Sequence, residues 1–373
     1  MGHDLLPPSP LILGGEALPL VGPARIYACG VTPYDVTHLG HAATFVWVDA
    51  LVRTLRHANL TPIVTRNITD VDDVLTEAAR RAGAPYDEFA AIHQYDFDHD
   101  MSHLGVRRPD HEPRAHQHIG GVVRLAQALI DRDAAYHVGG TVYFRGAIAV
   151  ARSGLTEAEI LAALTEFGED LDDRAKESPI DVPVWRASHD SDPAWPSPWG
   201  PGRPGWHAEC TAMVLDTYGS SLDIHAGGAD LAFPHHAYEA AQAEAATGVA
   251  PFARSWMRVG TVRIGGEKMA KSTGNLVLVS ELLTEHRGAA IRLMILDRRW
   301  SEGWDFEPGL LAAAEGRLDA LHAAAGRRSD DAAAEAEVIR RLLDDLDVPG
   351  ATAVALESGG RAARVLVQVL GLS

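Results

Sequence analysis

An apolar, β-prone run from Arg25 to Val31 leads through the turn-rich stretch TPYDVTHLGH into a helical pattern over residues 42–58. A second apolar run covers 62–68, and the Thr and Asp residues of 69–73 suit the N-cap of a helix over 74–82. Strands that alternate with helices predict an α/β fold with a parallel, doubly wound, Rossmann-like sheet. Ligands of such sheets bind where the strand order reverses, outside the carboxyl ends of the strands.

The alternating pattern is interrupted from about Asp98 to Trp185 by helices, many charges and a glycine-punctuated strand pair near 137–144. It resumes at Gly205 with, in order, a helix through Thr217, a strand at 222–225, a Gly-Gly turn, a helix over 235–246 and a strand around 256–262. We therefore expect four parts: the first half of a nucleotide-binding catalytic domain (1–96), an insertion (97–200), the second catalytic half (201–305) and a small C-terminal helical region (306–373).

The segment His38-Leu39-Gly40-His41 lies between the first predicted strand and its helix. A helix N-terminus favours anions, and two imidazoles there can donate hydrogen bonds to charge that develops on a phosphate. Because this chain is rich in histidine, an HxGH pattern alone is weak evidence. Its position at the end of the first strand makes a nucleotide site the favoured interpretation.

The segment Lys268-Met269-Ala270-Lys271-Ser272 holds two of the three lysines in a chain with 33 basic residues. A solvated basic turn is the plain alternative. Two ammonium groups on a loop can instead stabilise the pyrophosphate that leaves when an acyl adenylate forms. Together, HLGH and KMAKS resemble the HIGH and KMSKS signatures of class I aminoacyl-tRNA synthetases, a resemblance that implies joining of a carboxylate to AMP with ATP, and its Mg²⁺, as substrate.

Cys29, Cys210 and His235 are predicted at strand ends or helix starts around the same crevice. Taken singly, each is more often a core cysteine or a capping histidine. Two thiolates and one imidazole would leave a tetrahedral Zn²⁺ with an open position, which a substrate thiolate could fill. The set, with YACG, NITDVDD, GRPGWHAEC and LDIHAGGADLAFPHH, resembles cysteinyl-tRNA synthetases, and that resemblance adds Glu239 as a fourth candidate ligand.

The segments TPYD, HLGHAAT and VWRAS resemble the mycothiol cysteine ligases more than the tRNA enzymes. The ligase resemblance implies transfer of cysteine to the amine of glucosaminyl-inositol. It places around the cysteinyl adenylate the residues Gly30, Thr32, Thr69, Trp206, Gly228 and Asp230. For Trp206 and the glycines, a packing or turn role is the plain alternative.

Composition bears on the partner. The formal net charge of −18 and the absence of a recognisable anticodon-binding region both argue against tRNA. Neither a membrane span nor a signal peptide is evident, so we expect a soluble cytoplasmic enzyme without a disulfide between its two cysteines. The sequence leaves the oligomeric state open, with a monomer among the options.

Three departures from the family motifs leave the identity of the acceptor amine open. Ala237 replaces the Glu of FPHHE, Ala270 replaces the Ser of KMSKS, and AGGAD is less glycine-rich than usual. A truncated tRNA-charging core, a paralogue that acylates another amine, and a silent binding protein remain alternatives.

Overall fold

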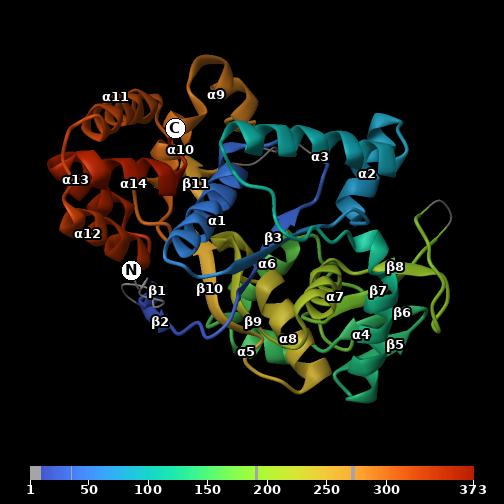
Figure 1. Cartoon of the computed structure of the whole chain (residues 1–373). Coiled ribbons are helices and arrows are strands. Elements are labelled where there is room, and N and C mark those ends of the chain that lie inside the picture. The colour runs from blue at the N-terminus through green and yellow to red at the C-terminus, as the bar shows by residue number, and fades with distance from the viewer. Residues whose placement is uncertain (1–9, 35, 190–191, 270–273) are drawn as a thin grey trace.

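The computed structural model describes residues 10–34, 36–189, 192–269 and 274–373. Its central sheet has four parallel strands in the order β10-β9-β3-β4 (Figure 1). These are β3 (Ala24–Val31), β4 (Pro62–Ile68), β9 (Leu222–Gly228) and β10 (Ala253–Val259). The parallel α/β sheet predicted from the alternating pattern is confirmed. Since β4 and β9 pair with opposite edges of β3, the strand order reverses at β3, where a ligand crevice is expected.

The two faces of the sheet are covered by different helices. Ile26 and Ala28 of β3 belong to the apolar cluster built around α1 (Leu39–His57), whereas Tyr27 and Cys29 belong to a second cluster. That second cluster includes residues of α7 (Trp206–Tyr218) and α8 (His235–Thr247). Because successive strand residues point to opposite faces, Cys29 is directed towards α7 and α8, away from α1.

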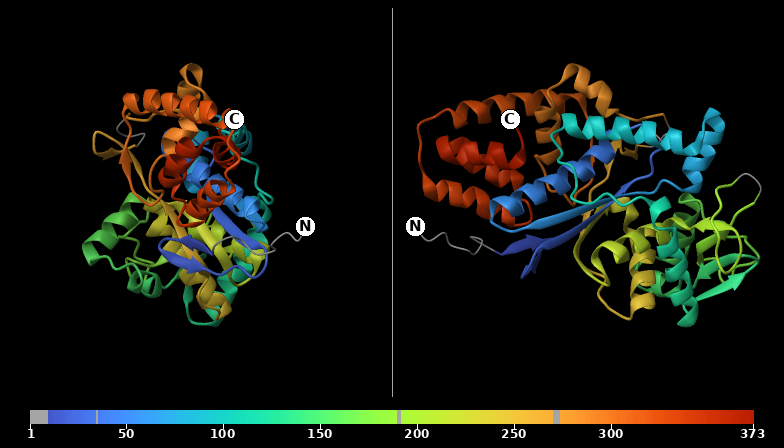
Figure 2. Two further views of the ribbon diagram at one scale, coloured as in Figure 1. Left: turned by 60° about the vertical axis from the view of Figure 1, so that its left-hand side comes forward. Right: turned by 45° about the vertical axis from the view of Figure 1, so that its right-hand side comes forward.

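The region between β4 and α7 contains a separate antiparallel sheet in the order β5-β6-β7-β8. The predicted strand pair is present as β5 (Ala135–Val138) and β6 (Thr141–Phe144), and two strands that the sequence pattern did not reveal extend it, β7 (Val182–Ala187) and β8 (Gly202–Pro204). Its apolar face packs on α4 (Ile119–Asp131) in a core of its own around the buried Trp185. Figure 2 shows this part and the C-terminal helices at opposite ends of the central sheet.

The C-terminal region is helical, as expected, and joins the core of the catalytic half. It comprises α11 (Pro308–Ala325), α12 (Ala332–Leu343), α13 (Val348–Ser358) and α14 (Gly360–Leu370), whose apolar residues share one cluster with α1. The fully buried Arg292 of α10 (Gly288–Leu296) forms an ion pair with Asp49 of α1 and donates to the backbone carbonyl of Leu370. A buried charge needs such partners, so these contacts fasten α14 to the catalytic half.

The remaining elements are short or lie at the edges: β1 (Leu11–Leu13), β2 (Glu16–Leu18), α2 (Asp73–Ala82), α3 (Tyr86–His103), η1 (Ala115–Gln117), α5 (Ala147–Ala151), α6 (Glu157–Glu166), η2 (Ala229–Ala232), β11 (Val262–Ile264), β12 (Glu267–Lys268), α9 (Val279–Glu285) and β13 (Trp304–Asp305). Within the described residues, no helix has the length and apolar character needed to cross a membrane.

Candidate functional site

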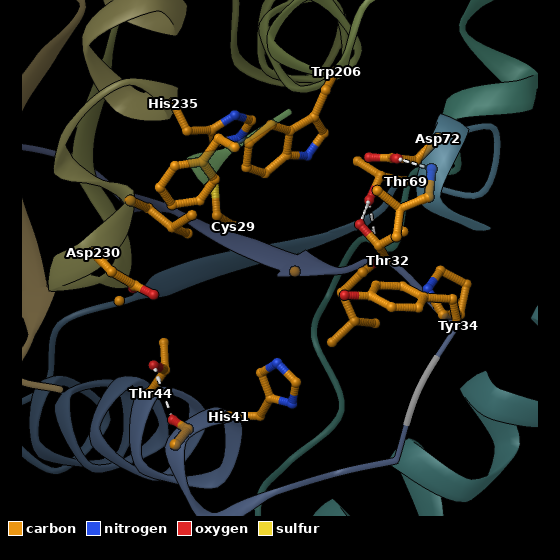
Figure 3. Close-up of a pocket in the computed structure, with 18 of the residues that line it drawn as sticks. Cys29, Thr32, Tyr34, His41, Thr44, Thr69, Asp72, Trp206, Asp230 and His235 are labelled. Atoms are coloured by element: carbon orange, nitrogen blue, oxygen red, sulfur yellow. Dashed lines mark hydrogen bonds between the residues drawn. The ribbon is translucent and has the colours of Figure 1, made fainter. Parts of the chain in front are cut away.

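A cavity of about 610 Å³ opens at the carboxyl ends of β3 and β9, next to the start of α1. It is lined by most of the predicted site residues: Cys29, Gly30, Thr32, His38, His41, Thr69, Trp206, Cys210, Gly228, Asp230, His235 and Lys268 (Figure 3). Glu239 lies one helical turn behind His235 and contacts the lining cysteine Cys29. Lys271 and Ala270 lie outside the described residues.

The HLGH segment forms the first turn of α1. His38 is the N-cap, and its Nδ1 accepts a hydrogen bond from the Gly40 amide at 3.1 Å. The rings of His38 and His41 stack with centroids 3.8 Å apart. A Cβ on Gly40 would lie only 2.9 Å from the His38 ring, so glycine is needed for this packing. The segment thus presents two imidazoles and a helix N-terminus to the cavity, an arrangement suited to phosphate.

Lys268 reaches the cavity from β12. Its ammonium lies 2.9 Å from Asp230, which follows β9, and 3.4 Å from Glu166 at the end of α6. The same ammonium lies over the ring of Phe167, 5.7 Å from the centroid. Burial lowers the pKa of Lys268, but Asp230 and Glu166 outweigh it and hold that pKa above its ordinary value. Lys268 is therefore a cation at neutral pH.

Polar groups link the ends of β3 and β4 beneath the cavity. The hydroxyls of Thr32 and Thr69 lie 2.7 Å apart, and the amide of Gly30 donates to Asn67 Oδ1 at 2.7 Å. A Cβ on Gly30 would lie 1.7 Å from the backbone oxygen of Asn67, so only glycine permits this approach. Asn67 also donates through Nδ2 to Cys210 Sγ at 3.2 Å. The strand ends thus connect the hydroxyl pair to the thiol region.

The predicted metal ligands converge. One ligand atom each from Cys29, Cys210, His235 and Glu239 lies within 4.8 Å of the other three, and all four residues are buried. Cys29 Sγ lies 3.8 Å from both oxygens of Glu239. His235 Nδ1 lies 2.8 Å from His207 Nδ1, which leaves His235 Nε2, 3.6 Å from Glu239, free to face the cluster. An outer contact on one ring nitrogen that orients the other is typical of metal-binding histidines.

The protonation chemistry of the two cysteines and the histidine fits a metal. Burial, with further effects of Cys210 and Glu239, raises the pKa of Cys29 well above its ordinary value, and burial raises that of Cys210 to about 11. Burial likewise lowers the pKa of His235 to about 3, which keeps the imidazole neutral. Buried thiols deprotonate readily only beside a strong positive charge, and two thiols with a neutral imidazole are ligands that Zn²⁺ prefers.

A second group of potential ligands shares Cys29 and Glu239 with the first and adds His225 and His236, which the sequence analysis did not single out. His225 Nε2 lies 3.1 Å from Glu239, and its ring stacks on Trp256 with centroids 4.8 Å apart. His225 is the register partner of Tyr27 in the sheet, a pairing between strands far apart in the sequence. The second group lacks Cys210 and so offers only one thiol.

Trp206 forms a wall between the metal-ligand cluster and the insertion. Its ring stacks on His235 at a centroid distance of 4.0 Å and on Phe167 at 5.7 Å. Ala237, which stands where the family motif has Glu, packs on the apolar core of the insertion.

Glu209 is a lining residue that the sequence analysis missed, although it lies three residues after Trp206 and hence on the same face of α7. Its side chain is fully buried, and neither carboxylate oxygen has a hydrogen-bond partner among the described residues. Burial, reinforced by repulsion from Asp72, Asp70 and Asp73, raises the pKa of Glu209 well above its ordinary value.

Comparisons with known proteins give a consistent result. Residues 21–316 match the family described as tRNA synthetases class I (C) catalytic domain. A relative from Frankia casuarinae, named L-cysteine:1D-myo-inositol 2-amino-2-deoxy-alpha-D-glucopyranoside ligase, is 44% identical over 336 residues, which cover 88% of this chain and 72% of the relative. A cysteine–tRNA ligase from Alkalilimnicola ehrlichii is 40% identical over 351 residues, covering 90% of this chain and 74% of that protein. Mycobacterium tuberculosis methionyl-tRNA synthetase shares the fold, with a TM-score of 0.62, 16% identity, and coverage of 94% and 82%.

Proposed function

This chain belongs to the family of class I (C) tRNA-synthetase catalytic domains, and on that premise we propose that it is an ATP-dependent ligase that activates cysteine and transfers it to the amine of glucosaminyl-inositol. The observation that carries the proposal is the meeting of two kinds of residue in one cavity. HLGH and Lys268 lie on the nucleotide side, and a cluster of two thiols, an imidazole and a carboxylate lies across β3. The ligase name of the relatives at 40–44% identity supports the amino-sugar acceptor.

In the first half-reaction the cysteine carboxylate attacks the α-phosphate of ATP, a phosphorus–oxygen bond forms, and pyrophosphate leaves. His38 and His41 at the start of α1 donate to the phosphates, and Lys268 offsets the charge on the departing pyrophosphate. We assign Lys271 the same role on the basis of the sequence alone. Thr32, Thr69 and Trp206 line the space for the amino acid. Gly228, at the end of β9, permits close approach of the ribose, and Asp230 beside it can hold the substrate ammonium.

Cys29, Cys210, His235 and Glu239 would hold Zn²⁺, which supplies a soft Lewis acid that holds the cysteine thiolate and discriminates against serine. In the second half-reaction the neutral acceptor amine attacks the acyl carbon of cysteinyl-AMP. An amide bond forms, the nitrogen loses one proton, and AMP leaves. We place this activity in the cytoplasm as part of the same proposal.

The second candidate function is the charging of tRNA, which the 40% identical cysteine–tRNA ligase favours and the net charge of −18 disfavours. AMP release with ATP, cysteine and Zn²⁺ separates the two when glucosaminyl-inositol and total tRNA are compared as acceptors. The proposal requires AMP release and a new amide with the amino sugar alone. Cysteinyl-tRNA as the only product would replace the proposal with the second candidate.

A further inference from the structure

The cavity has two polar ends. Asp230 and Lys268 mark the end that the nucleotide occupies in the proposed function. Asp72 lies at the opposite end, beyond Thr69, as Figure 3 shows. The same cavity also includes Asp73, Arg186 and Glu209, which form a predominantly acidic lining without an assigned ligand.

The carboxylates near this end differ in their partners. Asp70 lies 2.6 Å from His116, and Asp73 lies 2.5 Å from Arg203, so both have a basic partner already. Asp72 accepts from the backbone amide of Val74 at 2.8 Å, through the oxygen that caps α2. Glu209 is fully buried, lines the cavity, and has two carboxylate oxygens without a hydrogen-bond partner among the described residues.

A buried carboxylate that lacks partners costs free energy unless a ligand supplies donors. Cysteinyl-AMP cannot satisfy this end through its phosphate, because carboxylates repel a phosphate. An amino group and hydroxyl groups, by contrast, donate hydrogen bonds that carboxylates accept. The acceptor amine must also reach the acyl carbon, and Glu209 is adjacent in sequence to Cys210 of the thiol cluster.

We propose that Glu209 and Asp72 form the acceptor subsite, in which their carboxyl groups accept hydrogen bonds from the amino group and neighbouring hydroxyls of an amino polyol. This assignment rests on the proposed function, because it locates the acceptor of that same reaction. Arg186 faces the same space and is held by Glu169 at 3.2 Å, so the wall of the subsite is positioned by the insertion.

The test compares both half-reactions in the Glu209→Gln variant, which keeps the size of the side chain and replaces one carboxyl oxygen with an amide nitrogen. We expect the KM for glucosaminyl-inositol to rise at least about tenfold, because the amide nitrogen of Gln cannot accept the hydrogen bond that a carboxyl oxygen of Glu209 accepts from the acceptor. Cysteine-dependent pyrophosphate exchange, which needs no acceptor, should keep its rate and its KM for cysteine within about threefold. Glucosyl-inositol, which has a hydroxyl in place of the amine, should inhibit the variant and the wild type about equally.

Asp216→Asn is the matched control. Asp216 lies on the same helix as Glu209, outside the cavity lining, and pairs with His118 at 2.9 Å. It should change neither half-reaction. Asp72→Asn provides a second test should Glu209→Gln fail to fold, since asparagine can keep the N-cap of α2.

The outcomes separate this assignment from the proposed function. A wild-type enzyme that exchanges pyrophosphate but never consumes glucosaminyl-inositol contradicts the proposed function, and the subsite with it. If the wild type does consume the sugar, a rise in the KM for cysteine with an unchanged KM for the acceptor assigns Glu209 to the amino acid and overturns the subsite. An unchanged KM for the acceptor in both variants overturns it as well.

Discussion

The ammonium of Lys268 and the carboxylate of Asp230 lie 2.9 Å apart, so Lys268 at the end of β12 is anchored to a residue that follows β9. Glu166 of the insertion lies 3.4 Å from the same ammonium, but its side chain is 63% exposed, compared with 36% for Asp230. Exposed ion pairs contribute about 0–1 kcal/mol, so the two carboxylates should differ in their effect on Lys268.

We expect Asp230→Asn to lower kcat/KM for ATP in pyrophosphate exchange by about tenfold or more, because it frees Lys268 and alters the nucleotide end of the cavity. Glu166→Gln should lower the same quantity by less than about fivefold. Steady-state exchange at varied ATP concentration measures both. Equal losses in the two variants would contradict the distinction.

The two overlapping groups of metal ligands predict different zinc contents. Zinc bound by Cys29, Cys210, His235 and Glu239 should fall below about a tenth of an equivalent in Cys210→Ala, whereas His225→Asn should retain most of it. Elemental analysis of the purified, folded proteins measures this without reference to activity. Zinc that persists in Cys210→Ala but disappears in His225→Asn would assign the metal to the second group.

Asp72 predicts a pH dependence of folding stability. Burial raises its pKa to about 6 from 3.8, so the folded state binds this proton more tightly than the unfolded state does. The group's contribution to stability is therefore greatest below the unfolded value and is lost as pH rises through 6. Asp72→Asn lacks this loss.

The free energy of unfolding of Asp72→Asn, relative to the wild type, should increase by roughly 1 kcal/mol between about pH 5 and pH 8. Urea denaturation of the wild type and the variant at the two pH values measures it. A difference that shrinks as pH rises would show that Asp72 ionises more easily in the folded state.

The buried pair of Arg292 and Asp49 predicts a large effect of removing one partner. Arg292→Met should destabilise the protein by about 3–5 kcal/mol, because it leaves the buried side chain of Asp49 without its buried partner. Arg53 also binds Asp49, at 2.6 Å, but its side chain is 15% exposed, so Arg53→Met should cost about 1 kcal/mol. Denaturation in urea compares the two variants. A similar loss of stability in both would mean that Arg53 contributes as much as Arg292 to holding Asp49.

Much of the fold could be predicted because local patterns determine it. The runs at 25–31 and 62–68 became β3 and β4, and the helix expected after Asp72 begins at Asp73. Strands β7 and β8 were missed because strand pairing between residues far apart in sequence, such as Trp185 with Pro204, leaves little local periodicity.

The candidate site was predictable where its residues belong to recognisable sequence motifs, as HLGH and the two cysteines do. Glu209 and His225 belong to the same motifs as the cysteine and histidine ligands but were not identified. Nothing in the sequence reports that the side chain of Glu209 is buried without a hydrogen-bond partner, or that His225 faces the potential metal ligands. Such properties arise only when α7, α8 and β9 are packed together.

The alternation of side chains along β3 has a consequence for evolution and redesign. Cys29 belongs to the face that packs on α7 and α8, whereas Ala28, its neighbour, packs under α1, the helix that carries HLGH. In the proposed function, the residues that choose the amino acid and the helix that handles ATP thus pack on opposite faces of one strand. On that proposal, substitutions on the face of Cys29 could change the amino-acid specificity while the packing of α1 stays intact.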